Sequence, residues 1–299
     1  MDIKEFEISV PWGHIAVKAW GDERNKAIVM VHGLNDNAGS FDRIIPHLSK
    51  HYYYVCVDLP GHGKSSHFPK SAPLQELNLA MSLKIVVDSL KQKKIIMIAH
   101  GWGAQLSSLF AQLYPEIVEK LILIEGVCLR PLSVDYFRQF TTDFIEKSIH
   151  ILNKSMIENP TKLTYEKALD LTINERENGK LNKEAAAAIL KRHLKKVGND
   201  QYTITRDLRN NVRYSLFITK DYALRLFEEH NITCPVLFIF SKHSAPLMED
   251  NIDIINVIKQ SNHNCTIKEL GRDQDMHCNL PELVAPTINE FLHKFNSNL

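Results

Sequence analysis

The sequence lacks an excess of charge of either sign, because 36 Lys and Arg residues are balanced by 35 Asp and Glu residues. A net charge of +1 provides no strong attraction to nucleic acid or to an anionic membrane surface. No apolar run is long enough to span a bilayer. The first ten residues, MDIKEFEISV, alternate like a strand and do not resemble a signal peptide. We therefore expect no nucleic-acid partner, no membrane span and a cytoplasmic location.

Paired cysteines and clustered metal ligands are also missing. The five cysteines are scattered without CxxC spacing, so we expect free thiols rather than disulfides or a zinc site. The fourteen histidines are dispersed, and no metal or organic cofactor is implied. The final Ser297-Asn298-Leu299 weakly resembles a Ser-Lys-Leu peroxisomal signal that lacks its basic residue, which keeps the peroxisome as an alternative location.

Strand and helix patterns alternate through the first third of the chain. Residues 5–10 and 14–20 predict an antiparallel pair, and short apolar runs predict further strands. These runs cover residues 27–31, 52–58, 94–99, 121–125, 235–240 and 264–270. Helical periodicity covers residues 41–48 and 74–90, and Pro281 opens a final helix. This alternation predicts an α/β architecture with a mostly parallel sheet.

The composition changes between residues 129 and 230. This stretch is charged and favours helices, as in residues 182–194 (NKEAAAAILKRHL). We predict a core formed by residues 1–128 and 231–299, with a helical cap inserted at 129–230.

Residues 98–104 (IAHGWGA) have the spacing of a strand-to-helix nucleophile elbow. Ala99 and Gly103 supply the small flanking residues that the sharp turn needs. Gly101 stands where serine, cysteine or aspartate would act, and it has no side chain that can attack a substrate. The nucleophile sits at strained, positive φ in such elbows, so glycine keeps this geometry without the Cβ penalty.

Three segments together resemble one family. They are residues 31–34 (VHGL), residues 58–66 (DLPGHGKSS) and the elbow, and over its whole length the chain resembles the α/β-hydrolase superfamily. Residues 32–46 and 53–67 are similar to the serine hydrolase-like proteins of animals, whereas residues 102–104 (WGA) resemble epoxide hydrolases and haloalkane dehalogenases. The resemblance implies an α/β-hydrolase fold, with a mostly parallel eight-stranded sheet flanked by helices and a cap inserted after the sixth strand.

In such enzymes a nucleophile attacks an electrophilic carbon, and a histidine held by an acid acts as base. The resemblance places Gly101 at the nucleophile, Ser244 at the acid and Gln274 at the base. A glutamine cannot accept a proton at neutral pH. Glu125 stands where some relatives carry the acid. His277 lies one helical turn after Gln274, either as a flanking residue or drawn into the site by a distorted loop.

Parts of a binding pocket are retained. The resemblance implies that the backbone N–H groups of Leu34 and Trp102 point into an oxyanion position, where a carbonyl, carboxylate or water could bind. Trp102 either forms the pocket wall or donates its indole N–H to a ligand. Gln274 could orient a ligand or a water, and Gly101 would lie beside it.

We therefore predict a protein of this fold with a substituted triad, a pseudoenzyme that binds a small apolar or ester-like molecule between core and cap. One alternative is an active ester or epoxide hydrolase in which Glu125 and His277 activate a water. The second is a structural or signalling protein with a filled pocket. A protein partner that binds through the cap is compatible with each hypothesis.

Overall fold

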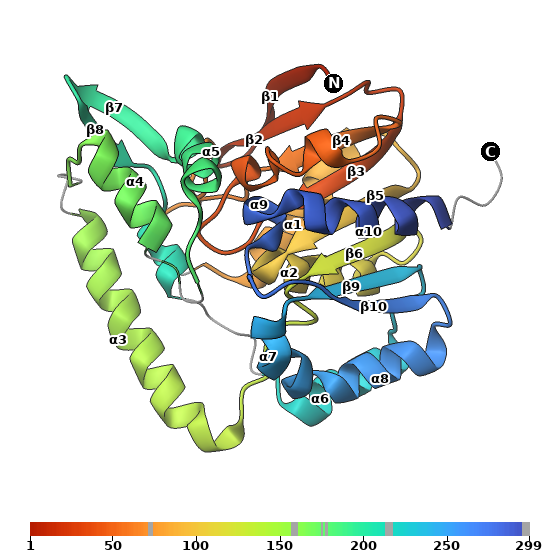
Figure 1. The fold of residues 1–299 in the computed structure, drawn as a ribbon. Coiled ribbons are helices and arrows are strands. Elements are labelled where there is room, and N and C mark those ends of the chain that lie inside the picture. The colour runs from red at the N-terminus through yellow and green to blue at the C-terminus, as the bar shows by residue number, and fades with distance from the viewer. Residues whose placement is uncertain (71–73, 157–160, 175, 177–178, 213–217, 295–299) are drawn as a thin grey trace.

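The computed structural model describes residues 1–70, 74–156, 161–174, 176, 179–212 and 218–294 (Figure 1). Within these residues, one sheet contains eight strands in the order β1-β2-β4-β3-β5-β6-β9-β10. The pairs β1–β2 and β2–β4 are antiparallel, and every later pair is parallel. This arrangement confirms the predicted α/β fold with a mostly parallel sheet.

The strands of this sheet follow the predicted apolar runs closely. Their bounds are β1 (Ile3–Val10), β2 (Gly13–Trp20), β3 (Lys26–Val31), β4 (Tyr52–Val57), β5 (Ile95–His100), β6 (Val118–Ile124), β9 (Val236–Phe240) and β10 (Cys265–Glu269). All residues of β4, β5 and β9 are buried. Strands buried on both faces are continuous apolar runs, which made them recognisable in the sequence.

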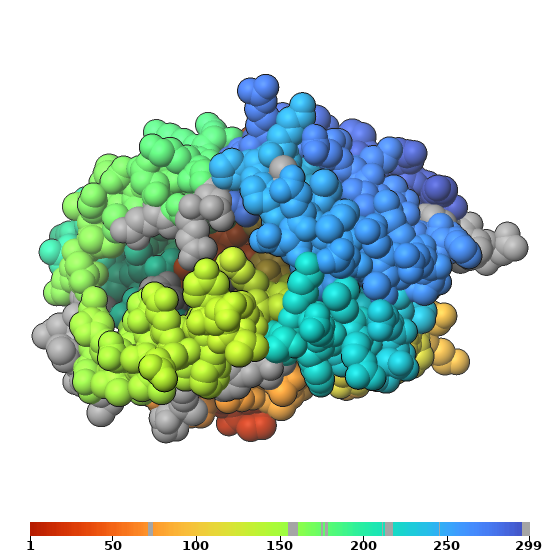
Figure 2. Space-filling model, turned by 90° about the horizontal axis from the view of Figure 1, so that it is seen from below, coloured from red at the N-terminus to blue at the C-terminus, as the bar shows by residue number. Residues whose placement is uncertain are grey.

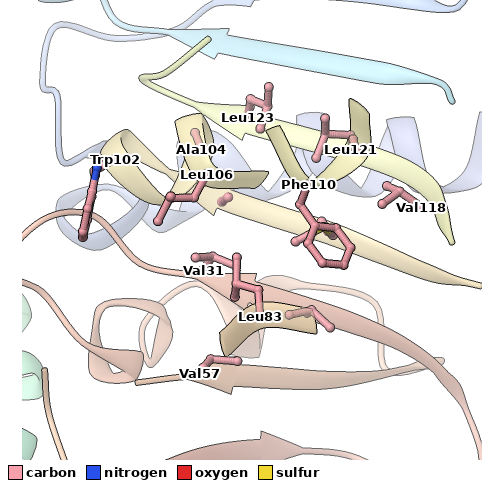
Figure 3. Packing of buried hydrophobic residues seen from close by; sticks show 14 of the residues in the cluster. Val31, Val57, Leu83, Trp102, Ala104, Leu106, Phe110, Val118, Leu121 and Leu123 are labelled. Carbon is pink, nitrogen blue, oxygen red and sulfur yellow. The ribbon is translucent and has the colours of Figure 1, made fainter. Parts of the chain in front are cut away.

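Helices cover both faces of the sheet. On one face, α1 (Glu76–Ser89), α2 (Gly101–Leu113), α6 (Lys220–Glu229) and α8 (Ile252–Ser261) contribute to one apolar cluster. On the other face, α10 (Pro281–Lys294) packs with the 3₁₀ turns η1 (Ala38–Phe41) and η2 (Ile45–His47). Figure 3 shows that Leu106 and Phe110 of α2 point into the first cluster, whereas Trp102 stands apart at the start of the helix. Trp102 therefore lies at the edge of the core, beside the elbow.

One predicted helix was wrong. Residues 41–48 do not form a single α-helix, and the chain makes η1 and η2 with a break between them. Pro46 lies at the start of η2, and a proline inside a helix would remove a hydrogen bond and clash with the preceding turn. Apolar spacing alone did not reveal that break.

We call residues 134–212 the cap. It contains η3 (Val134–Tyr136), α3 (Phe137–Met156), α4 (Tyr165–Asn174), α5 (Lys183–His193), the β7 (Leu194–Gly198) and β8 (Gln201–Ile204) hairpin and η4 (Leu208–Asn211). The helix α3 extends along the outer edge of the molecule (Figure 1). The face in Figure 2 is hollowed between α3 and the α4 side of the cap. The cap is therefore open on this face.

The helix α6 lies within the predicted cap range but packs with the core. Its buried Ala223 and Phe227 join the cluster that contains Ile254 and Ile258 of α8. The division of the chain at residues 129 and 230 otherwise stays a prediction.

The short helices α7 (Ala245–Asp250) and α9 (Met276–Asn279) and the turn η5 (Lys242–Ser244) complete the described structure. Across the described residues, no helix combines the length and the hydropathy that a bilayer crossing needs. The tripeptide Ser297-Asn298-Leu299 lies outside the described residues, so the alternative location stays untested.

Candidate functional site

The elbow has the backbone geometry that its motif predicts. Gly101 follows β5 directly, begins α2 and has a φ of +53°. A non-glycine residue in this left-handed conformation costs about 1–2 kcal/mol. A Cβ added to Gly103 would collide with the carbonyl oxygen of His32, so the small flanking residue is required. A Cβ added to Gly101 would meet only the Cα of Gly33 within 4 Å, at 3.8 Å, so a side chain has room there.

The two loop motifs are held together by buried polar contacts. Leu59 N–H donates to Nε2 of His32 at 3.1 Å, and Nδ1 of His32 contacts the carbonyl of Gly33 at 2.7 Å. With Nε2 accepting, Nδ1 carries the hydrogen. Asp58 accepts the backbone N–H groups of Ala38 and Lys64, each at 2.8 Å. Because these motif residues satisfy backbone groups, they hold the loops around the elbow.

Glu125 occupies the acid region of the site. It follows β6 with a φ of +56°, and its carboxyl accepts the N–H of Ser241 at 2.5 Å and the hydroxyl of Ser244. Ser241 Oγ lies 2.9 Å from Ser244 Oγ. Burial raises the pKa of Glu125 to about 8 despite the hydrogen bonds from Ser241. The structure therefore brings Glu125 and Ser244 together, and burial favours the neutral form of the Glu125 carboxyl.

The base region contains two predicted residues in different environments. Gln274 is half-buried, and its backbone lies close enough to His100 to influence the pKa of that ring. His277 is fully buried, its ring centroid lies 4.1 Å from that of His100, and its Nε2 is 3.1 Å from Sγ of Cys278. Burial holds the pKa of His277 well below its usual range. Among the described residues, no hydrogen bond or ion pair joins His277 to Glu125.

Trp102 lines a narrow cleft beside the elbow. It is 7% exposed, and this small cleft is also lined by Leu74, Leu79 and Val212. A second small cleft shares Leu74, Arg209 and Val212 with the first. Ile151 and Leu152 of α3 extend its apolar wall. The shared residues make the two clefts neighbours that lead from Trp102 toward α3.

Leu34 lies in the loop after β3. It is half-buried and packs against the apolar core cluster. The oxyanion role of the Leu34 and Trp102 N–H groups stays a prediction.

An ionic cluster beside the elbow was not predicted. Asp36 follows β3, Asp275 precedes α9 and Arg176 belongs to the cap. The Arg176 guanidinium donates to Asp36 Oδ1 at 2.7 Å and to Asp275 Oδ2 at 2.8 Å. Burial by itself would raise the pKa of Asp36, but the charge and hydrogen bonds of Arg176 lower it overall. The nitrogens of His100 lie 3.9 Å from each of the two carboxylates.

This cluster contains atoms that could hold a cation, although no metal site was expected. One atom each from Asp36, His100 and Asp275 lie within 4.8 Å of one another. The three residues are separated by 64 and 175 positions in the chain and share no spacing motif. The sequence offered one indication of this cluster: Asp36, His100 and Asp275 each lie at the end of a predicted strand or before a helix, at the same edge of the sheet.

Comparisons with known proteins agree with this fold. The alpha/beta hydrolase fold family model matches residues 26–204. A serine hydrolase-like protein of Danio rerio is 28% identical over 293 residues, covering 96% of this chain and 88% of the relative. Serine hydrolase-like protein 2 of Homo sapiens is 29% identical over 301 residues, covering 97% and 94%.

Solved structures show the same architecture. A hypothetical protein of Pseudomonas aeruginosa PAO1 has a TM-score of 0.81 at 25% identity, covering 97% of this chain and 98% of that chain. A thioesterase domain from the curacin biosynthetic pathway has a TM-score of 0.76 at 19% identity, covering 96% and 99%, and shows the fold alone. With a family match over more than half of its length, this chain belongs to the alpha/beta hydrolase fold family and is related to the serine hydrolase-like proteins of animals.

Proposed function

We propose that this chain is a non-catalytic member of its family and binds a small, mostly apolar molecule between core and cap. The observation that carries this proposal is the elbow itself. Gly101 has the conformation of a nucleophile and room for a side chain, but it offers no attacking atom. Without a nucleophile, covalent catalysis of the usual kind cannot begin.

The surroundings of the two alternative catalytic residues support the same proposal. His277 is fully buried with a strongly lowered pKa, so it is a weak proton acceptor. The carboxyl of Glu125 is engaged by Ser241 and Ser244 rather than by an imidazole. A water-activating pair of Glu125 and His277 would need both side chains to move.

The lining of the clefts favours an apolar ligand. Leu74, Leu79, Trp102 and Val212 form the apolar half of the wall near the elbow, and Ile151 and Leu152 continue it under α3. Four polar residues complete the wall near the elbow: Gln75, Glu76, Arg209 and Asn210. Ligand sites are concave, mostly apolar and carry few polar groups. Both clefts are small, so the expected ligand is either narrow or widens the gap beneath α3 as it binds.

The proposal is tested by measuring turnover of aryl esters and epoxides by purified protein, and by native mass spectrometry for co-purifying molecules. We expect no turnover above the uncatalysed rate and a bound small molecule. Turnover that Glu125→Gln and His277→Ala each abolish would instead establish the active-hydrolase alternative. Gly101→Ser alone is expected to remain inactive, because Gln274 cannot accept the serine proton.

A second candidate function is a structural or signalling protein with a filled pocket. One observation favours it, because the Arg176 side chain of the cap already occupies the space between Asp36 and Asp275. Titration with a fluorescent apolar probe separates the two candidates. Saturable binding that Trp102→Ala weakens supports the ligand-binding function, and a lack of binding supports the filled pocket.

A further inference from the structure

Three buried hydrogen-bond acceptors converge beside the elbow. Asp36 is fully buried, Asp275 is 3% exposed and His100 is 5% exposed. One carboxylate oxygen from each aspartate and one ring nitrogen of His100 lie within 4.8 Å of one another. We call these three residues the acceptor triad. They come from the loop after β3, the end of β5 and the turn before α9, so the core positions all three.

The acceptor triad already holds one organic cation. Nη2 of Arg176 donates to Asp36 at 3.2 Å and to Asp275 at 2.5 Å, using the same oxygens that face His100. Arg176 comes from the cap, and the guanidinium neutralises only one of the two carboxylates. A formal charge of −1 therefore remains in a buried site, which favours a cationic ligand and disfavours an anionic one.

The side chain of His100 is a second observation, beside the remaining negative charge, that points to a ligand at this site. Neither of its ring nitrogens makes a hydrogen bond of normal geometry to a described residue, although the backbone of Gln274 is close. Buried polar atoms are nearly always hydrogen-bonded. A neutral imidazole offers one acceptor nitrogen, so His100 can supply a third acceptor beside the two carboxylates.

The spacing of the acceptor triad favours an organic cation over a metal ion. Acceptors about 2.8 Å from one ammonium nitrogen, in tetrahedral directions, lie about 4.6 Å apart. Ligands about 2.1 Å from a metal ion lie only about 3.4 Å apart. Nδ1 of His100 lies 3.9 Å from Asp36 and Nε2 lies 3.9 Å from Asp275, and one ring nitrogen with one oxygen of each aspartate lie within 4.8 Å of one another. A metal ion would require the three groups to close inward.

Gly101 lies between the acceptor triad and the apolar cleft along the chain. His100 precedes Gly101 and Trp102 follows it, and a Cβ at Gly101 would meet only the Cα of Gly33 within 4 Å. There is therefore room for a further carbon atom at this position. A ligand with its charged head at the acceptor triad would direct its hydrocarbon part past Gly101 toward Trp102 and Leu79.

We propose that the ligand of this protein carries a protonated amine or guanidinium, which binds Asp36, Asp275 and His100 in place of Arg176. This inference rests on the proposed ligand-binding function and names the chemistry of its polar end. In the resting chain Arg176 acts as an internal competitor that holds the cap against the core. Ligand binding releases that contact.

The experiment compares hexylamine with hexanol and hexanoate, which have the same chain length but a neutral or anionic head. Binding is measured at pH 7 by calorimetry and thermal unfolding for the wild type and Arg176→Ala. We expect hexylamine to bind the wild type more tightly than either control, and Arg176→Ala to bind it at least about tenfold more tightly than the wild type, because the competitor is gone. Adding Asp275→Asn to Arg176→Ala should remove the preference for the amine.

Two control variants separate a specific effect on amine binding from a general effect on the cap. Arg138→Ala, in the exposed part of α3, should leave hexylamine binding unchanged. Arg176→Gln replaces Arg176→Ala if circular dichroism shows that the alanine variant does not fold. Equal binding of all three compounds would overturn the cationic head group and leave the proposed function standing, and binding of none would remove both. A wild-type protein that ignores hexylamine, or a variant stabilised by Zn²⁺ but not by amines, would also overturn the inference.

Discussion

The two halves of the cap are attached to the core in opposite ways. In the half formed by α5 and the residues after it, Arg192 pairs with Asp58 at 2.8 Å, and Asn37 of the core donates to the carbonyl of Ile189 at 2.9 Å. Ile189 is 1% exposed. In the half formed by α3, no side chain between residues 137 and 154, all described, is buried. Ile145 and Ile149 are about half exposed.

The two halves of the cap therefore have different roles: the α5 half stabilises the fold, and the α3 half covers the apolar cleft. The α5 half satisfies buried carboxylates and backbone groups of the core, so it is part of the cooperative structure. The α3 half covers the apolar cleft through half-buried residues such as Ile151 and Leu152. Elements with few buried apolar contacts open at low free-energy cost. For the proposed ligand-binding function, this difference predicts entry beneath α3 while α5 stays in place.

The largest expected effect comes from breaking the α5 attachment. Arg192→Met should lower the free energy of unfolding by about 3–5 kcal/mol, because it leaves the carboxylate of Asp58 buried without its cation. Denaturant unfolding measures the change. The matched variant Arg138→Met in α3 should change stability by less than about 0.5 kcal/mol. Similar losses in both variants would contradict the distinction between the two halves.

Replacing one isoleucine in each half of the cap by alanine measures how differently the two halves are packed. Ile189→Ala should cost about 2–5 kcal/mol, because it opens a cavity in the small core around α5. Ile149→Ala removes the same atoms from a half-exposed side chain and should cost less than about 0.5 kcal/mol. Thermal unfolding of the two variants, measured side by side, gives the difference directly.

A smaller effect on stability is expected from a buried carboxyl without an arginine partner. Asp36 is paired with Arg176, and Asp58 is paired with Arg192. Glu125 is instead hydrogen-bonded to serines and lies near the charges of Asp273 and Asp275. Its pKa is raised from 4.5 to about 8, so the folded protein binds one more proton than the unfolded chain between these pH values. The contribution of Glu125 to stability should therefore fall as pH rises from 4.5 to 8, by up to about 1.4 kcal/mol per unit.

This pH dependence is measured between pH 6.5 and 8. Buried histidines with lowered pKa values, including His193 and His277, act in the opposite direction, because their unfolded rings still bind protons up to about one unit above pH 6.5. The contribution of Glu125 is therefore read as the difference in slope between the wild type and Glu125→Gln. Glu125→Gln should make the change of stability with pH more positive from pH 6.5 to 8 and leave the acid limb unchanged. An unchanged slope in this variant would assign the extra proton to another group.

Most of the core was predictable from the sequence because its signals are local. The strand β5, the turn at Gly101 and the helix α2 follow from an apolar run, flanking small residues and helical spacing. The prediction that each triad position is substituted rests on the same kind of local motif and stays a prediction. Helical periodicity did not predict the structure of residues 41–48. Pro46 has no N–H group to donate, and the chain forms two short 3₁₀ turns there instead of one helix.

The ionic cluster was not predictable, although each of its residues is printed in the sequence. Asp36 and Asp275 resemble ordinary loop residues, and Arg176 lies in a charged stretch where arginines are common. They form a site only because the fold brings the Arg176 guanidinium into hydrogen-bond contact with both carboxylates. The contact between Glu125 and Ser244 likewise joins residues 119 positions apart, and no local pattern links them.

Local sequence was enough to establish the fold and the elbow with glycine at its turn, because apolar periodicity and small-residue spacing act over a few neighbouring residues. Only the tertiary structure decided that a cap arginine lies between two core carboxylates beside the elbow, and that the ends of the cap differ in attachment. The physical reason is burial. Charges that are removed from water must be paired, so the buried carboxylates and the arginine adopt one specific arrangement.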